Sequence, residues 1–206
     1  YFSLRDIFED SKVQPSTLAL LLDDFETQHG RFHDDATVKD EQIITLDQVI
    51  ELEEIFKKRA IETLESGSAL DRYNGLNFLW MLGKIDPELV ASKKKSIITD
   101  EISLVRVLSY CTSNGKVSGR ITSKTWQVNL KNIEEFIDVD EAYQRIQAYV
   151  TTNNFLTLSE DDQMNVTAFL LTMEKKSENG IMENHIVEES IQKELRKLVS
   201  NITSND

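Results

Sequence analysis

Two glycine–lysine pairs, Gly83-Lys84 and Gly115-Lys116, are where the sequence comes nearest to a nucleotide-binding loop. A P-loop has the form Gly-x-x-x-x-Gly-Lys-Ser/Thr, because backbone N–H groups must cradle the phosphates and a hydroxyl must reach Mg²⁺. The other motif positions hold the wrong residue types, with Phe78 and Tyr110 for the first glycine and Ile85 and Val117 for the hydroxyl. The sequence therefore contains no P-loop.

The histidines are the second group whose spacing could do chemistry. His29 and His33 are four residues apart, as in the zinc motif His-Glu-x-x-His, but Gly30 lies between them at an expected helix end. The two side chains therefore need not share a helix face, which joint ligation of one ion would require. His185 stands alone, and a solvated or capping role is expected. We expect no metal site.

The remaining groups able to act in catalysis are carboxylates and one thiol. Adjacent acids recur, but in a chain with 36 Asp+Glu an acidic pair does not by itself mark a catalytic site. Cys111 lies in the apolar stretch 105–111 with no histidine near it in sequence, so a buried, inert thiol is expected. We therefore expect no catalytic residue and no cofactor.

Charge and hydropathy limit the kinds of partner. The 23 Lys+Arg and 36 Asp+Glu give a net charge of −13, which disfavours unaided binding to nucleic acid. The longest apolar runs, 18–22 and 78–82, fall far short of the roughly 20 residues of a membrane span. A single cysteine excludes a disulfide within the chain and fits a reducing compartment. We expect a cytoplasmic protein with no membrane contact and with protein partners.

Glu53 and Lys57 are the first candidate partner contacts. Both project into the apolar stripe of the helix expected over 46–66, four residues apart, with the acid before the base. One interpretation is an ion pair within the helix at a crowded helix crossing. The other is a contact with a partner domain.

The second candidate contact surface is a small basic and aromatic cluster, Lys116, Arg120 and Trp126, with Lys124 beside it. Such a cluster could contact a nucleotide, an acidic partner protein or the rest of a parent chain. A hairpin surface with Trp126 folded inward is the alternative.

The elements that position these residues are predicted to be helices, because only seven Gly and two Pro interrupt the chain. Caps and apolar periodicity predict helices over 15–30, 46–66, 70–82, 87–98, 133–137, 140–151, 159–175 and 182–202. A further helix is predicted to begin after its cap, Asp100. In the apolar run 76–82, Trp80 is expected to be nearly inaccessible. The fold class expected is all-α, an irregular multi-helix bundle with at most one short β-hairpin near 115–130.

Domain organisation follows from the same patterns. We expect one helical domain over residues 1–206, with a sub-boundary near 113–123, where the sequence turns polar and glycine-bearing. The chain starts at Tyr1 and enters a helical pattern at once, so we expect a fragment of a larger protein, although cleavage of a tag would look the same.

One segment resembles a known family. It comprises Ile43–Phe56, Ala60-Ile61-Glu62, the small-residue break 65–68, Leu79-Trp80-Met81 and Ile85-Asp86. These residues resemble the helical region that follows the ATPase core in KAP-type, STAND-related P-loop NTPases, many of them bacterial and suspected of phage defence or signalling. The resemblance covers residues 1–140 and implies an ATPase core upstream in a parent protein. None of that family's Walker residues can be placed in this chain.

The function expected on these grounds is a non-catalytic accessory or regulatory module of a P-loop NTPase that acts through protein contacts. A free-standing helical adaptor is one alternative. An enzyme with a carboxylate-based site that the sequence does not reveal is the other.

Overall fold

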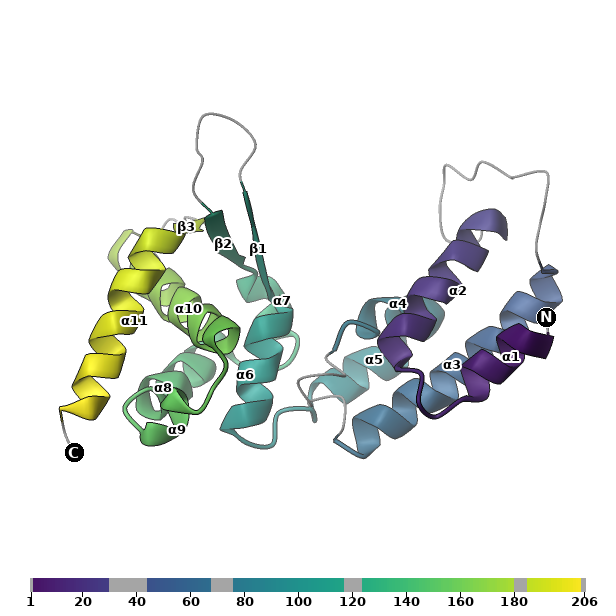
Figure 1. The fold of residues 1–206 in the computed structure, drawn as a ribbon, viewed down its shortest axis with the longest axis horizontal. Helices are drawn as coiled ribbons and strands as arrows, with labels where there is room; N and C mark the ends of the chain where they lie inside the picture. The colour runs from purple at the N-terminus through teal and green to yellow at the C-terminus, as the bar shows by residue number, and fades with distance from the viewer. Residues whose placement is uncertain (1, 30–43, 68–75, 117–123, 180–184, 205–206) are drawn as a thin grey trace. The chain divides into compact units, whose positions relative to one another are not determined.

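The computed structural model describes residues 2–29, 44–67, 76–116, 124–179 and 185–204. Within these ranges the chain forms eleven helices, which hold 73% of the described residues, and a small three-stranded antiparallel sheet. The prediction of a mainly helical fold with a short hairpin is confirmed. The chain divides into two compact units, Tyr1–Lys93 and Lys94–Asp206, whose elements are labelled in Figure 1.

The first unit is built around one long helix. Its elements are α1 (Phe2–Glu9), α2 (Pro15–His29), α3 (Leu46–Glu65), α4 (Leu79–Ile85) and α5 (Pro87–Lys94). Helix α3 packs against α1, α2 and α4. The core side chains between them are fully buried, among them Phe8, Leu22, Leu52, Phe56 and Met81.

Local sequence signals define the ends of α3. The Thr45 side chain accepts from the backbone N–H of Gln48, and the Gln48 side chain accepts in return from Thr45 N, which completes the predicted capping box. At the other end Gly67 has φ +74°, a conformation that costs little only for glycine. Arg59 then ties α3 to the chain before α2, donating to the carbonyls of Phe8 at 3.0 Å and Val13 at 2.6 Å.

The second unit is organised around α10. Its elements are α6 (Glu101–Tyr110), β1 (Thr112–Lys116), β2 (Lys124–Val128), α7 (Leu130–Glu134), α8 (Val139–Tyr149), α9 (Asn153–Leu156), α10 (Glu160–Asn179), β3 (Ile186–Val187) and α11 (Glu188–Thr203). Helix α10 packs against α6, α8, α11 and β2 (Figure 1). Asp100 caps α6 as predicted, since its carboxylate accepts from Ser103 N at 2.7 Å.

The sheet lies inside this second unit in the order β1-β2-β3. Thr112 faces Val128 at one end of the β1–β2 ladder and Lys116 faces Lys124 at the other, so the predicted hairpin is present. The third strand was not predicted, and it pairs Ile186 with Trp126. The polar segment 113–123, which the sequence suggested as a sub-boundary, falls within this unit, and residues 117–123 lie outside the described residues.

The prediction for Trp80 is wrong. Its ring is half-buried, and the Lys84 ammonium lies 4.8 Å from the ring centroid. The described helix begins at Leu79, so the apolar run does not turn all its side chains inward as a long helix buried on every side would. The neighbours Phe78, Met81 and Leu82 are fully buried as expected.

Candidate interaction site

Glu53 and Lys57 have different surroundings. The Glu53 side chain is only 3% exposed, on the face of α3 that enters the core of the first unit. The Lys57 ammonium forms an ion pair with Asp86 at 2.6 Å. The Asp86 carboxylate raises the pKa of Lys57, and Lys57 in turn lowers the pKa of Asp86. Lys57 thus links α3 to the residue that precedes α5.

The predicted basic and aromatic cluster is described only in part. Trp126 is 2% exposed, which places its ring in the interior of the second unit, and Lys124 Nζ lies 4.7 Å from the ring centroid. Lys116 belongs to β1, but its side chain lies outside the described residues, and so does Arg120. A role for these residues as partner contacts stays a prediction.

Of the thiol and the histidines noted in the sequence, Cys111 and His29 have defined surroundings. Cys111 is 4% exposed, and burial raises the pKa of its thiol to about 12, which keeps it protonated at neutral pH. His29 Nε2 lies 2.9 Å from the Ile44 carbonyl oxygen, and His33 lies outside the described residues. Among the described residues no group of three His, Cys, Asp or Glu could hold a metal ion.

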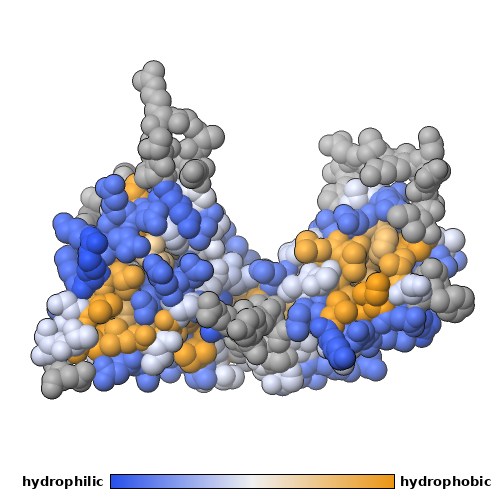
Figure 2. All heavy atoms as spheres, viewed as in Figure 1, coloured by the Kyte–Doolittle hydropathy of each residue, from blue (hydrophilic) through white to orange (hydrophobic). Residues whose placement is uncertain are grey.

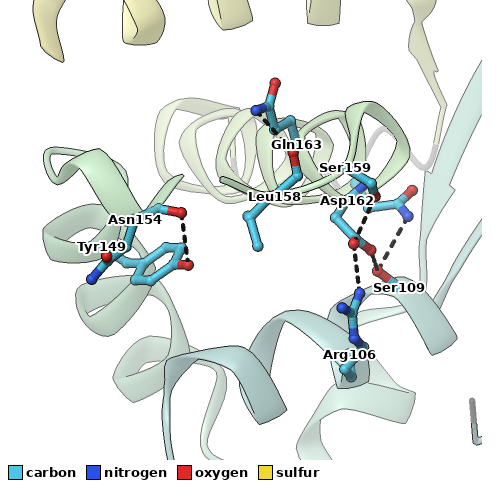
Figure 3. Close-up of polar contacts among 9 residues, drawn as sticks. Arg106, Ser109, Tyr149, Asn154, Leu158, Ser159, Asp162 and Gln163 are labelled. Atoms are coloured by element: carbon cyan, nitrogen blue, oxygen red, sulfur yellow. Dashed lines mark hydrogen bonds and ion pairs between the residues drawn. The ribbon is translucent and has the colours of Figure 1, made fainter. Parts of the chain in front are cut away.

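A buried polar cluster joins α6 to the first turn of α10 (Figure 3). The Asp162 carboxylate accepts from Arg106 at 2.5 Å, from Ser109 Oγ at 3.0 Å and from Ser159 Oγ at 2.7 Å. Ser159 also accepts from the Asp162 backbone N–H at 3.2 Å, as the N-cap of α10 does in a capping box. Asn165 donates to Ser109 at 3.3 Å and completes the cluster.

The ionised form of the Asp162 carboxyl group is stabilised by its neighbours. Burial alone would raise the pKa of this carboxyl, but the hydrogen bonds from Arg106 and Ser159 and the charge of Arg106 outweigh it, and the pKa lies below its ordinary value. An ionised, fully hydrogen-bonded carboxylate of this kind fixes the position of a helix terminus. The cluster therefore determines where α10 begins, and it is a structural junction.

An open groove of about 610 Å³ lies between the start of α10 and the adjacent face of α11. Its α11 side is a single helical stripe, spaced at three and four residues: Gln192, Leu195, Arg196, Val199, Ser200 and Thr203. Its α10 side is formed by Glu160 and Gln163. Figure 2 shows apolar surface beside the C-terminal half of α11, bordered by hydrophilic residues.

The α10 side of the groove is held by hydrogen bonds. Gln163 Nε2 donates to the carbonyls of Phe155 and Leu158, each at 3.3 Å, and Figure 3 shows its amide on the opposite side of α10 from the Asp162 carboxylate. Gln192 Nε2 lies 3.4 Å from Met164 Sδ across the α10–α11 contact. These contacts preorganise both sides of the groove, so a ligand would not have to order them.

The charges at the groove are available to a ligand. Arg196 and Glu160 are both exposed, and neither forms an ion pair within the described ranges. The nearby Lys197, in contrast, is paired with Glu194 at 2.9 Å. Six of the eight lining residues are polar, Leu195 is only 8% exposed, and Val199 is partly exposed. The groove therefore presents mainly polar groups, with one cation and one anion among them.

The sequence did not predict this site. The apolar seam of the last helix was visible, with Ile191, Leu195 and Ile202 on its buried side. The first turn of α10 is 32 residues before Gln192 in the chain, and only the packed structure places the two together. The sequence predicted a helix over 159–175, but not the contacts at its start.

Comparisons with protein-family models, with curated proteins and with solved structures find no match to this chain. None of the helices in the described ranges has the length and apolar character needed to cross a membrane.

Proposed function

We propose that this chain is a non-catalytic accessory module of a P-loop NTPase in the cytoplasm. It binds the NTPase core, attached or separate, through protein contacts and regulates or positions it. The observation that supports the proposal is the open groove between α10 and α11, which carries the exposed charges of Arg196 and Glu160.

The composition of the groove supports a protein partner. Protein interfaces combine an apolar centre with a polar, solvent-accessible rim. Here Val199 is a partly exposed apolar side chain, Leu195 is only 8% exposed, and exposed Arg196 and Glu160 form the rim. The net charge of −13 further favours proteins over nucleic acids as partners.

The choice of an NTPase as partner rests on the sequence. The segment Ile43–Phe56 together with Leu79-Trp80-Met81 resembles the helical region after the ATPase core of KAP-type proteins. In the first unit most of these residues lie on α3 and α4, which pack against each other. Leu52, Phe56 and Met81 of the resembling residues are fully buried in the first unit, whereas Ile50 is 40% exposed.

In the test, this chain is titrated into a recombinant KAP-type ATPase core. Isothermal calorimetry measures binding, and a separate assay measures the rate of Mg-ATP hydrolysis by the core. We expect saturable binding and a change in turnover of at least twofold. Arg196→Glu should weaken binding, whereas the control Lys193→Glu, which makes the same charge change on the exposed side of α11 outside the groove, should not. Absence of both binding and any turnover change would refute the NTPase assignment.

A further inference from the structure

We infer that the outer edge of β1 binds an extended, acidic segment of a partner protein, which pairs with β1 as a fourth strand of the sheet. This inference goes beyond the proposed function, because it concerns a different surface and does not depend on the partner being an NTPase. Three features of β1 lead to it: the direction of its backbone groups, its open edge, and the charge of the hairpin.

The register of the sheet determines which backbone groups of β1 point outward. The Asn129 N–H donates to the Cys111 carbonyl at 2.9 Å, and the Gly115 carbonyl accepts from the Thr125 hydroxyl at 3.4 Å, so Cys111 and Gly115 face β2. In an antiparallel ladder, residues that bond to the neighbouring strand alternate with residues that do not. The alternate residues of β1 therefore direct their backbone N–H and C=O away from β2: Thr112, Asn114 and Lys116.

This outer edge of β1 is open. The strand is at one end of the order β1-β2-β3, and within the described residues no other strand pairs with it. Ser113, Asn114 and Gly115 are exposed, and no helix or loop in the described ranges forms a hydrogen bond with the Asn114 backbone. An unpaired edge of this kind is a template for an extended chain, which satisfies its alternating donors and acceptors with its own backbone.

The charge of the hairpin selects an acidic segment. No Asp or Glu occurs from residue 102 to residue 133, although the whole chain has 36. Lys116 and Lys124 are opposite each other at the end of the ladder, and like charges directly opposite destabilise a sheet. The Lys124 ammonium lies 4.7 Å from the centroid of the Trp126 ring and has no carboxylate partner within the described residues. An acidic residue on an added strand beside Lys116 would offset this repulsion.

Two other occupants fit the edge less well. A second copy paired antiparallel through its own β1, centred on Asn114, would place Lys116 opposite Thr112 of the second copy, so it would bring no acid to the two lysines. A nucleic acid would bring negative charge, but its phosphates cannot match the alternating N–H and C=O groups of a strand edge. The edge and the charge together therefore favour an acidic protein segment.

The test uses a displayed library of nine-residue peptides, which is selected on the full chain, and the enriched peptides are titrated by fluorescence anisotropy. We expect enrichment of Asp or Glu among residues of high strand propensity. N-methylation of alternate backbone amides of an enriched peptide should weaken binding at least tenfold in the frame that faces β1, and less than twofold in the other frame. This pair of peptides tests backbone pairing without any change to the protein.

Two matched variants of the chain test the charge. Lys124→Glu should weaken binding of the acidic peptide at least fivefold, and a peptide with Lys in place of the selected acid should regain binding to that variant. The control Lys131→Glu makes the same charge change at an exposed position of α7, outside the sheet, and should weaken binding less than twofold.

Several results would overturn the inference. One is a library from which no peptide is enriched, or peptides enriched without an acidic preference. Another is an equal effect of the two N-methylated frames, which would show that the backbone of the peptide does not pair with β1. Equal weakening by Lys124→Glu and Lys131→Glu would reveal only a long-range charge effect. A single-stranded oligonucleotide that displaces the peptide would point to a nucleic acid, and a dimer in sedimentation that the peptide dissociates would point to a second copy.

Discussion

The Arg106 guanidinium donates to the Asp162 carboxylate at 2.5 Å across the junction of α6 and α10. This contact orients the first turn of α10 relative to α6. Asp162 faces α6, and the next residue, Gln163, faces the groove (Figure 3). The stability of the second unit and the geometry of the candidate site thus depend on the same helix start.

Breaking this ion pair should destabilise the second unit. The side chains of Arg106 and Asp162 are 17% and 9% exposed, so Arg106→Ala leaves a buried carboxylate without its main partner. We expect a loss of about 3–5 kcal/mol in the free energy of unfolding. Urea titration in a Trp80→Phe background, where Trp126 reports on the second unit, measures it. The control Lys197→Ala removes a surface pair with Glu194 in the same unit and should cost less than about 1 kcal/mol. Equal losses would contradict the role of the junction.

The same carboxylate predicts a dependence of stability on pH. The folded-state pKa of Asp162 lies below its ordinary value, so its stabilising contribution is present above the unfolded pKa of about 3.9. That contribution is lost as the pH falls through the folded-state pKa. Asp162→Asn should therefore flatten the fall in stability below about pH 4 relative to wild type. Asp161→Asn, the same change at the exposed neighbouring position, is the control for the loss of one negative charge.

The two tryptophans should respond differently to solvent and to truncation. Trp126 is 2% exposed and Trp80 is half-buried, so iodide should quench Trp80 emission in Trp126→Phe far more than Trp126 emission in Trp80→Phe. Trp126→Ala should cost about 3–5 kcal/mol in the free energy of unfolding, the usual range for a buried large aromatic. Efficient quenching of Trp126 would show that its ring is not in the core.

Local signals predicted much of the fold, and long-range contacts account for the errors. The capping boxes at Thr45 and Asp100 were visible because a cap and its partner lie three residues apart. Trp80 was misplaced because burial depends on which faces of α4 meet neighbouring helices. Strand β3 was missed because two residues carry no periodic pattern, and its pairing with Trp126 is far apart in sequence.

The isolated chain should neither bind nor hydrolyse ATP. Phe78 and Tyr110 occupy the first glycine position of both incomplete phosphate-binding motifs, and a net charge of −13 opposes polyanions. Isothermal titration with Mg-ATP should give only heats of dilution. Micromolar binding would refute the accessory-module account and favour an unrecognised enzyme.

The most direct test of the central claim is hydrogen–deuterium exchange of this chain with and without the ATPase core. A partner protein bound in the groove would shield α11 and the start of α10 from solvent. The account predicts slower exchange of amides in residues 192–203 and 160–163 on binding, and no such change for Arg196→Glu at the same core concentration. Binding of the core with protection confined to other helices would contradict the claim that this groove is the contact surface.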